Sequence, residues 1–182
     1  MGRVISSTFV SLDGVINHMD KWHFDFIDDE TDAIAMEQLQ HSDSLLMGRA
    51  TYDVYAGAWP TRDGELADRI NGMRKYVAST TLKTAEWNNT TVLGSDLVGE
   101  VAKLREQPGD ILMHGYGSVA RALLANGLLD ELFLWVHPHL AGAGSTDDMI
   151  WADGVNQRLR LLDTHILKSG LVTLSYAPAN AA

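Results

Sequence analysis

Cysteine is absent from the 182 residues of this chain. That absence excludes disulfide bridges, catalysis by a thiolate and zinc sites built on cysteine. It fits a protein that works in a reducing compartment. The first residues also lack the basic and then apolar pattern of a secretory signal peptide. The sequence therefore predicts a cytoplasmic location.

Long apolar runs are also missing, since none approaches the roughly 20 residues that a membrane-spanning helix requires. Positive charge is scarce, with 14 lysines and arginines against 24 acidic residues and a net charge of −10. Such a chain has no basic stripe that could release counterions from nucleic acid. We expect neither nucleic acid nor a membrane as a partner. A small anionic ligand is compatible with the sequence if helix ends and a few arginines hold it.

The apolar content and the mean hydropathy of the chain are those of a globular protein. Apolar residues make up 46% of the chain, and the mean hydropathy is −0.07. The length is sufficient for a substantial core, and we find no internal repeat and no low-complexity linker. Residues 1–182 are therefore expected to form a single domain.

Strand-like and helix-like segments alternate along the chain. Helices are predicted after Asp28-Asp29, after Gly48, at 65–72, from Ser95 as cap to 105, and after the turn at Gly117. Strands are predicted at 3–12, 45–47, 74–79, 90–94, 111–113 and 131–137, with a closing hairpin over 158–177. This order predicts an α/β fold with a mostly parallel central sheet, helices on both faces and an antiparallel hairpin at one edge.

The segment at 111–127, ILMHGYGSVARALLANG, predicts a strand, a glycine turn and a helix. Gly115 and Gly117 permit a tight turn and a close approach of a ligand to the backbone. Ser118 is expected to cap the helix, and Gly127 to end it in a left-handed conformation. The N–H groups of the first helical turn would then favour a phosphate. Alone, this pattern is weakly specific, because many such turns use glycine for steric reasons.

A second strand, glycine and helix unit lies at 45–60, LLMGRATYDVYAGAWP. Arg49 and Thr51 fall in the first helical turn, where a guanidinium can bind a phosphate through two hydrogen bonds. A solvated surface arginine is the alternative. Ser79 and Thr80 end the strand at 74–79, and α/β sheets bind ligands at such strand ends. Ordinary loop hydroxyls are the alternative there.

The irregular segment between the first strand and the first helix is unusually aromatic, with Trp22, His23, Phe24 and Phe26. These rings either cover the end of the core or wall a pocket for a flat substrate, as Trp22 and Phe24 could. His137 and His139 flank Pro138 and could form a metal pair. No third ligand lies at a helpful spacing, so a structural role is favoured and no metal is predicted.

Taken together in this order, the motifs resemble the dihydrofolate reductase superfamily over nearly the full length. The branch that the chain resembles most contains the C-terminal reductase domain of riboflavin-biosynthesis enzymes. The resemblance implies a three-layer fold. It rests on FVSLDGVI (9–16), LLMGRATYDVYAGAWP (45–60), KYVAST (75–80), ILMHGYGSVARALLANGLLDEL (111–132) and the closing hairpin.

The resemblance implies an NADPH-binding reductase, similar to 5-amino-6-(5-phosphoribosylamino)uracil reductase. The strand end at 79–80 would contact the adenosine 2′-phosphate, and the opening strand and its loop would lie against the nicotinamide. The positions that match cofactor-binding positions of the family are Val10, Ile16, Gly48, Arg49, Thr51, Ser79, Thr80, Gly115, Gly117, Ser118 and Val119.

Two positions depart from the pattern of dihydrofolate reductase itself. Tyr116 stands between the two glycines of the turn, where that enzyme has adjacent glycines. Asp32 falls at the distance of the catalytic acid of that enzyme, but acidic residues crowd this helix and favour its first turn through the helix dipole. The proton for the reduction could come from Asp32, from Asp13 or from water.

Two further functions remain open at this stage. The chain could reduce dihydrofolate, or it could be a nucleotide-binding domain that has lost its substrate site. A homodimer is expected because relatives of the riboflavin branch dimerise. The apolar segment 131–137, ELFLWVH, could join two sheets across a two-fold axis.

Overall fold

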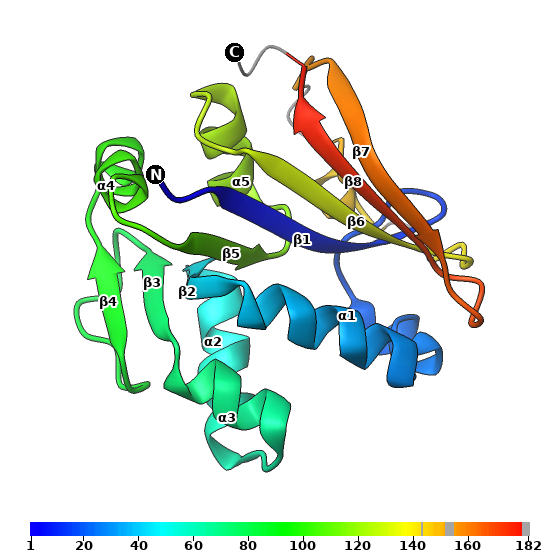
Figure 1. The fold of residues 1–182 in the computed structure, drawn as a ribbon, viewed down its shortest axis with the longest axis horizontal. Helices are drawn as coiled ribbons and strands as arrows, with labels where there is room; N and C mark the ends of the chain where they lie inside the picture. Colours follow the sequence, from blue (N-terminus) through cyan, green and yellow to red (C-terminus); the bar gives the residue numbers. More distant parts are fainter. Residues whose placement is uncertain (143, 152–154, 180–182) are drawn as a thin grey trace.

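The computed structural model describes residues 1–142, 144–151 and 155–179. Its strands form one sheet in the order β4-β3-β2-β5-β1-β6-β8-β7 (Figure 1). Neighbours from β4 to β6 are parallel, and the β7–β8 hairpin adds antiparallel strands beyond β6. The strands are β1 (Val4–Ser11), β2 (Ser42–Gly48), β3 (Arg74–Ala78), β4 (Thr90–Leu93), β5 (Asp110–His114), β6 (Glu131–His137), β7 (Leu159–Ile166) and β8 (Val172–Pro178). The predicted α/β architecture with an antiparallel hairpin at one edge is confirmed.

Helices cover both faces of the sheet and make three layers (Figure 1). The α-helices are α1 (Asp29–Gln40), α2 (Arg49–Ala58), α3 (Glu65–Gly72), α4 (Leu97–Arg105) and α5 (Ser118–Ala125). Short 3₁₀ helices lie at Met19–Lys21, Phe24–Phe26, Trp59–Thr61 and Thr146–Asp148. Within the described ranges, no helix is long and apolar enough to cross a membrane.

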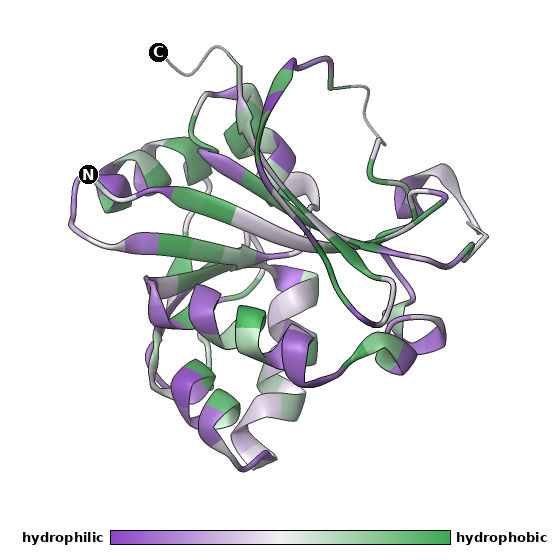
Figure 2. Ribbon diagram, turned by 45° about the vertical axis from the view of Figure 1, so that its right-hand side comes forward, coloured by the Kyte–Doolittle hydropathy of each residue, from purple (hydrophilic) through white to green (hydrophobic). Residues whose placement is uncertain are grey.

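Two hydrophobic clusters lie on opposite faces of the sheet because side chains alternate along each strand. Leu45 and Met47 of β2 pack with α1, α2 and α3. Leu46, between them, packs with α4 and α5. The central strands are therefore mostly hydrophobic, while the helices alternate hydrophobic and hydrophilic stretches (Figure 2).

Of the three helix caps that the sequence predicts, the structure confirms one. The Asp28 carboxylate accepts hydrogen bonds from the N–H groups of Glu30 and Thr31, both at 3.0 Å, and caps α1. The prediction for Ser95 is wrong, because α4 begins one residue later and Asp96 is its cap. The prediction for Ser118 is also wrong, since Ser118 is already the first residue of α5.

The strand β6 lies inside the sheet and has partners on both edges. β1 is its parallel neighbour, and β8 is its antiparallel neighbour. Its backbone groups are therefore engaged within one chain. Segment 131–137 offers no free strand edge to a second copy, because β4 and β7 are the outer strands of the described sheet. Its part in a two-fold interface stays a prediction.

Lys75 is a fully buried lysine on β3. Its ammonium donates hydrogen bonds to the carbonyl oxygens of Asn71 and Met73, both at 2.8 Å, and of Asn88 at 3.2 Å. It also lies 4.5 Å from the centre of the Trp87 ring. One side chain thus ties the end of α3 to the loop between β3 and β4.

Replacing Lys75 with methionine removes the donors for three carbonyl groups. We expect Lys75→Met to lower the free energy of unfolding by ~2–3 kcal/mol, the usual cost of leaving buried polar groups unsatisfied. The matched change Lys103→Met, at an exposed position of α4, should alter stability little. Urea denaturation measures both. Equal stability of Lys75→Met and the wild type would contradict this role.

Candidate cofactor site at the carboxyl edge of the sheet

The placement of β5 between β2 and β1 brings two glycine turns together. The turn from β2 into α2 and the turn from β5 into α5 both lie at the carboxyl edge of the parallel strands. A Cβ atom added to Gly48 would lie 3.3 Å from Cγ2 of Val119. The two groups of residues predicted separately from the sequence are therefore in contact. Open α/β sheets bind ligands at such an edge, where neighbouring connections run in opposite directions.

Both helices at this edge begin without a capping side chain. Gly48 precedes α2 and Gly117 precedes α5, and neither helix has a side-chain hydrogen bond at its cap. The first N–H groups of an α-helix have no partner within the helix. Two such helix starts side by side present several donors and two positive dipole ends to an anion.

The turn after β5 is open on its outer side. Gly115 has a φ of 102°, a backbone conformation that favours glycine. Gly117 has an extended backbone with φ −97°. A Cβ atom at either position would have no heavy atom of another residue within 4 Å. Protein contacts therefore do not explain why residue 117 is glycine, whereas the close approach of a ligand would.

Tyr116, which departs from the glycine pattern, does not fill this open side. Its side chain is only 6% exposed and packs in the cluster beneath α5 with Ala120 and Leu123. The tyrosine adds to the core below the turn and leaves the backbone on its outer side accessible. The departure therefore does not exclude a ligand at the turn.

Arg49 stands at the start of α2 with its charge pointing outward. Its Nε donates to both carboxylate oxygens of Asp53, at 2.7 and 2.8 Å. The terminal amino groups of Arg49 make no hydrogen bond to any residue that the structure describes. Asp53 thus fixes the guanidinium through Nε. The two terminal amino groups stay available to bind a planar anion through two hydrogen bonds. Thr51 lies in the same helical turn and is partly buried.

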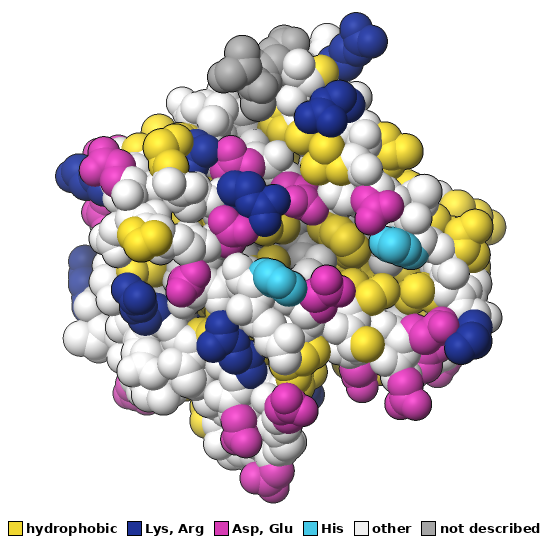
Figure 3. Space-filling model, in the orientation of Figure 1, with side chains coloured by type: hydrophobic (Ala, Val, Ile, Leu, Met, Phe, Trp, Pro, Cys, Tyr) yellow, Lys and Arg dark blue, Asp and Glu magenta, His cyan; other side chains and the backbone are white. Residues whose placement is uncertain are grey.

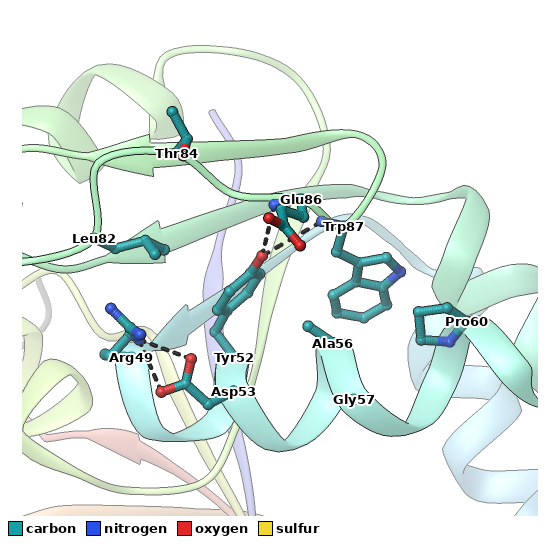
Figure 4. A pocket seen from close by; sticks show the side chains of 10 residues that line it. All are labelled: Arg49, Tyr52, Asp53, Ala56, Gly57, Pro60, Leu82, Thr84, Glu86 and Trp87. Carbon is teal, nitrogen blue, oxygen red and sulfur yellow. Dashed lines mark hydrogen bonds and ion pairs between the residues drawn. The ribbon is translucent and has the colours of Figure 1, made fainter.

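A cavity of about 440 Å³ opens beside Arg49, between α2 and the loop that follows β3 (Figure 4). Tyr52 joins its two walls, since its hydroxyl accepts hydrogen bonds from the N–H groups of Glu86 and Trp87 at 3.1 and 3.4 Å. Arg49 is the single lysine or arginine among the described residues that line the cavity. Its lining is Arg49, Tyr52, Asp53, Ala56, Gly57, Pro60, Leu82, Thr84, Glu86 and Trp87.

Ser79 and Thr80 begin the loop that forms one wall of this cavity. The Ser79 hydroxyl oxygen accepts a hydrogen bond from the N–H of Leu82 at 3.0 Å. The hydroxyl also lies 3.4 Å from Thr81 Oγ1. The role of Ser79 is therefore partly to shape the loop, and a ligand would compete with Thr81 for its hydroxyl hydrogen. Thr80 is exposed.

The end of β1 is tied to the loop that follows β6. The Asp13 carboxylate accepts hydrogen bonds from Ser11 Oγ at 2.6 Å and from the N–H groups of Ala141 and Gly142 at 3.0 and 2.8 Å. These hydrogen bonds, first the one from Ser11, lower the pKa of Asp13 to about 2. Asp13 is therefore an anchor for two loops and not a proton donor at neutral pH.

Val10 and Ile16, predicted to face a nicotinamide, lie on either side of this anchor. Both are buried, Val10 in β1 and Ile16 in the following loop. The N–H of Ile16 donates to the carbonyl oxygen of Asp148 at 2.8 Å, which holds the loop in place. Their contact with a cofactor stays a prediction.

The aromatic segment before α1 mostly covers the end of the core. Trp22 is 3% exposed, and its indole N–H donates to the carbonyl oxygen of Asn17. Phe24 is 64% exposed. Neither ring lines the cavity beside Arg49. A role for these two side chains against a substrate stays a prediction.

His23 and His137 form a buried pair under these rings. His137 Nδ1 lies 2.9 Å from the carbonyl oxygen of Trp135 and so carries the hydrogen. His137 Nε2 then accepts from His23 Nδ1 at 2.9 Å. Burial, together with His137, lowers the pKa of His23 to about 4. His137 thus links Trp135 to His23 through its two ring nitrogens. Among the described residues, no group of three or more histidine, aspartate or glutamate side chains that could hold a metal ion is found.

Asp32 is exposed on α1. An acid that donates a proton at neutral pH usually lies in a partly buried site, and Asp32 lacks such surroundings. Its catalytic role stays a prediction that the geometry does not favour.

A histidine that the sequence reading did not single out lies directly before the glycine turn. His114 ends β5, and its Nδ1 lies 2.8 Å from the hydroxyl oxygen of Tyr55 on α2. Burial lowers the pKa of His114 to about 4. One signal could have identified His114 from the sequence, namely its place at the end of a strand directly before Gly115.

A second hollow of about 230 Å³ lies on the face covered by α1, toward the amino ends of β1 and β5. Figure 3 shows histidines and acidic side chains around hydrophobic atoms there. Arg3 at its rim is paired with Asp110 and Glu131. The rim therefore mixes both signs of charge and has none of the helix starts found at the carboxyl edge.

The buried neutral histidines predict a loss of stability in mild acid. The pKa values of His23 and His114 are about 4 in the folded protein and about 6.5 in an unfolded chain. Between these values the unfolded chain binds more protons. The stabilisation is therefore complete above pH ~6.5 and is lost as the pH falls toward 4.

Urea denaturation between pH 7 and pH 4 measures this dependence. His23→Gln, which keeps a polar partner for His137 but does not titrate, should make the dependence on pH shallower. His165→Gln, at an exposed position of β7, should leave it unchanged. An unchanged slope in His23→Gln would contradict the account.

Comparison with known proteins identifies the family of this chain. A family model described as "RibD C-terminal domain" matches residues 3–173. The "Uncharacterized protein YyaP" of Bacillus subtilis (strain 168) is 29% identical in an alignment that covers 96% of this chain and 94% of that protein.

Solved structures with low sequence identity share the fold. A putative riboflavin biosynthesis protein from Shewanella sp. PV-4 has a TM-score of 0.73 at 19% identity, covering 99% of this chain and all (100%) of that one. A pyrimidine reductase-like protein from Corynebacterium diphtheriae has a TM-score of 0.65 at 16% identity, covering 98% and 92%. RibD from Acinetobacter baumannii has a TM-score of 0.66 at 17% identity, and the match covers 99% of this chain and 59% of that one. The match of the family model over nearly the whole length means that this chain belongs to the RibD C-terminal domain family.

Proposed function

We propose that this protein is an NADPH-dependent reductase of a small heterocyclic or sugar-like substrate, with a pyrimidine of the riboflavin pathway as the first candidate. One observation carries the proposal. Two uncapped helix starts lie side by side at the carboxyl edge, next to an arginine whose terminal amino groups are available. Membership of the RibD C-terminal domain family supports a reductase.

The residues present fit a phosphorylated dinucleotide. The backbone N–H groups that follow Gly48 and Gly117 would hold the pyrophosphate, and the open side of Gly117 would admit it. Arg49 and Ser79 would hold the 2′-phosphate, because one supplies a two-pronged cation and the other a hydroxyl donor. The nicotinamide would lie toward the end of β1, near Val10 and Ile16.

When bound, NADPH supplies the hydride for the reduction. The chain itself orients the reacting groups and keeps water from them. The Asp13 anchor and the packed loop of Ile16 are suited to that task, since they fix the end of β1 against the loop that follows β6.

The competing functions have less support. Dihydrofolate reduction would need an acid in the position of Asp32, and that residue is exposed. A nucleotide-binding domain without catalysis would share the cradle but would not oxidise NADPH.

A homodimer also stays a proposal. It would not use an edge of β6, because both edges are occupied within the chain.

The direct test mixes the protein with NADPH and 5-amino-6-(5-phosphoribosylamino)uracil and follows the loss of NADPH absorbance. The proposal expects turnover that requires both compounds. Dihydrofolate in place of the pyrimidine tests the first alternative. NADPH binding without turnover of either compound would support the non-catalytic domain and contradict the proposal.

Removing the guanidinium should abolish the preference for the phosphorylated cofactor. We expect Arg49→Ala to weaken NADPH binding about 10- to 100-fold, the range for a charged hydrogen-bonded partner, and to leave NADH binding nearly unchanged. Titration calorimetry with both cofactors measures this. Arg160→Ala, at an exposed position of β7, is the matched control. An equal loss for NADPH and NADH would show that Arg49 does not hold the 2′-phosphate.

A side chain at Gly117 should block the cofactor without harming the fold. The residue has an extended backbone and open space around a Cβ atom, so Gly117→Val should fold, with only the small loss of melting temperature that replacing glycine at a helix cap brings. The same variant should bind NADPH much more weakly, because the branched side chain occupies the outer face of the turn. Gly72→Ala, which also meets open space and lies at the end of α3 away from the cavity beside Arg49, serves as control. Wild-type affinity in Gly117→Val would remove the turn from the site.

A further inference from the structure

The Tyr55–His114 pair stands where α2 and β5 meet, one residue before the glycine turn. The Tyr55 hydroxyl oxygen lies 2.8 Å from His114 Nδ1. The two ring centres are 5.7 Å apart at 60°. Tyr55 also packs edge-on against Trp59 at 5.8 Å. Two different elements thus hold the imidazole in a single orientation at the edge of the proposed cofactor site.

The hydrogen-bonding pattern defines which nitrogen of His114 carries the hydrogen. Burial lowers the pKa of His114 to about 4 and raises that of Tyr55, so both side chains are neutral at pH 7. The Tyr55 hydroxyl has no other hydrogen-bond acceptor among the residues that the structure describes. A buried hydroxyl donates its hydrogen to an available acceptor. Tyr55 therefore donates to Nδ1, and the hydrogen of the imidazole is on Nε2.

The Nε2–H group of His114 is left as a free donor. No residue that the structure describes accepts a hydrogen bond from it, and His114 is only partly buried. Nε2 is also not among the fully buried side-chain atoms that lack a partner. Solvent, or a ligand that replaces it, can therefore reach this atom.

Other polar side chains gather on the same face of the sheet. Ser7 of β1 is the parallel partner of His114 in the strand register. Its hydroxyl donates to Gln38 of α1 at 2.9 Å and accepts from the indole N–H of Trp135 at 2.8 Å. The side chains on this face thus include fixed polar groups next to His114, between the helices α1 and α2.

We propose that His114 is a neutral hydrogen-bond donor that binds the reducible C=O or C=N group of the substrate through Nε2–H, and that Tyr55 is the positioning residue that fixes this tautomer. The inference rests on the proposed reductase function and deepens it. It identifies the substrate class as one in which the reduced bond ends in an oxygen or nitrogen acceptor.

The chemistry balances with NADPH as the reductant. The carbon of the C=O or C=N bond gains a hydride while NADPH is oxidised to NADP⁺. The electron pair of the double bond moves onto the oxygen or nitrogen, where the Nε2–H group stabilises the growing negative charge. Water then supplies the proton to that atom, so His114 itself stays neutral. A neutral imidazole is suited to this role because it donates a hydrogen bond without having to be protonated first.

The tautomer can be tested without any substrate. In protein labelled with ¹⁵N-histidine, NMR of the ring nitrogens should show His114 protonated at Nε2 in the wild type and a mixture of tautomers in Tyr55→Phe. Tyr76→Phe, a partly buried tyrosine that packs on the opposite face of the sheet, should leave the tautomer unchanged. A proton on Nδ1 in the wild type, or no change in Tyr55→Phe, would overturn the proposal.

Turnover of 5-amino-6-(5-phosphoribosylamino)uracil with NADPH tests the role in catalysis. His114→Phe should lower kcat about 100- to 1,000-fold, the usual effect of removing one such donor, with unchanged NADPH affinity. Its melting temperature should fall modestly, because the Tyr55 hydroxyl loses its acceptor. His114→Gln, which keeps an N–H donor, should recover part of the rate. The exposed change His165→Gln should have no effect.

The two levels of the proposal fail in different ways. A wild type that binds NADPH but does not turn over the pyrimidine would overturn the proposed function and this inference with it. An active wild type with an equally active His114→Phe variant would overturn the inference alone.

Discussion

The position of β5 between β2 and β1 is the constraint on which the candidate site depends. The chain leaves the first strand, builds β2, β3 and β4 outward, and then returns to fill the gap in the middle. Because these strands are parallel, the glycine turns after β2 and β5 end up at the same edge and next to each other. The contact of Gly48 with Val119 is the direct sign of this. Neither turn alone would make a cradle for a dinucleotide, since each provides only one helix start.

The same residues serve the core on one side and the site on the other. Tyr116 packs beneath α5, while the glycines on either side of it leave the backbone open outward. Tyr52 closes the wall of the cavity beside Arg49 with its hydroxyl, and its ring belongs to the cluster under α2. Buried polar groups such as Lys75 hold the surrounding loops. Hydrogen bonds and packing thus support the walls where the phosphates are expected, and the groups left unpaired are those that a ligand can use.

The sequence predicted the element order well because that order depends on local patterns, whereas the binding of a cofactor by the predicted residues stays a prediction. Apolar runs bounded by glycine marked the strands, and Gly48-Arg49 and Gly115–Gly117 marked the turns. The helix caps at Ser95 and Ser118 were predicted one residue out of place, since the choice between adjacent polar residues depends on where the helix geometry starts. The position of segment 131–137 inside the sheet could not be read locally, because an apolar strand looks the same at an edge and in the middle. The His114–Tyr55 and His23–His137 pairs join residues far apart in the sequence, and nothing local connects them.

The central claim is that the two helix starts at the carboxyl edge hold the phosphates of one cofactor. The most direct measurement is a titration of ¹⁵N-labelled protein with NADPH, followed through the backbone amide signals. The account predicts that the largest changes occur at Arg49 and its neighbours in α2 and at Ser118 and Val119 in α5, with the same binding curve for both groups. Binding that moves only one of these groups, or amides at the opposite edge of the sheet, would contradict it.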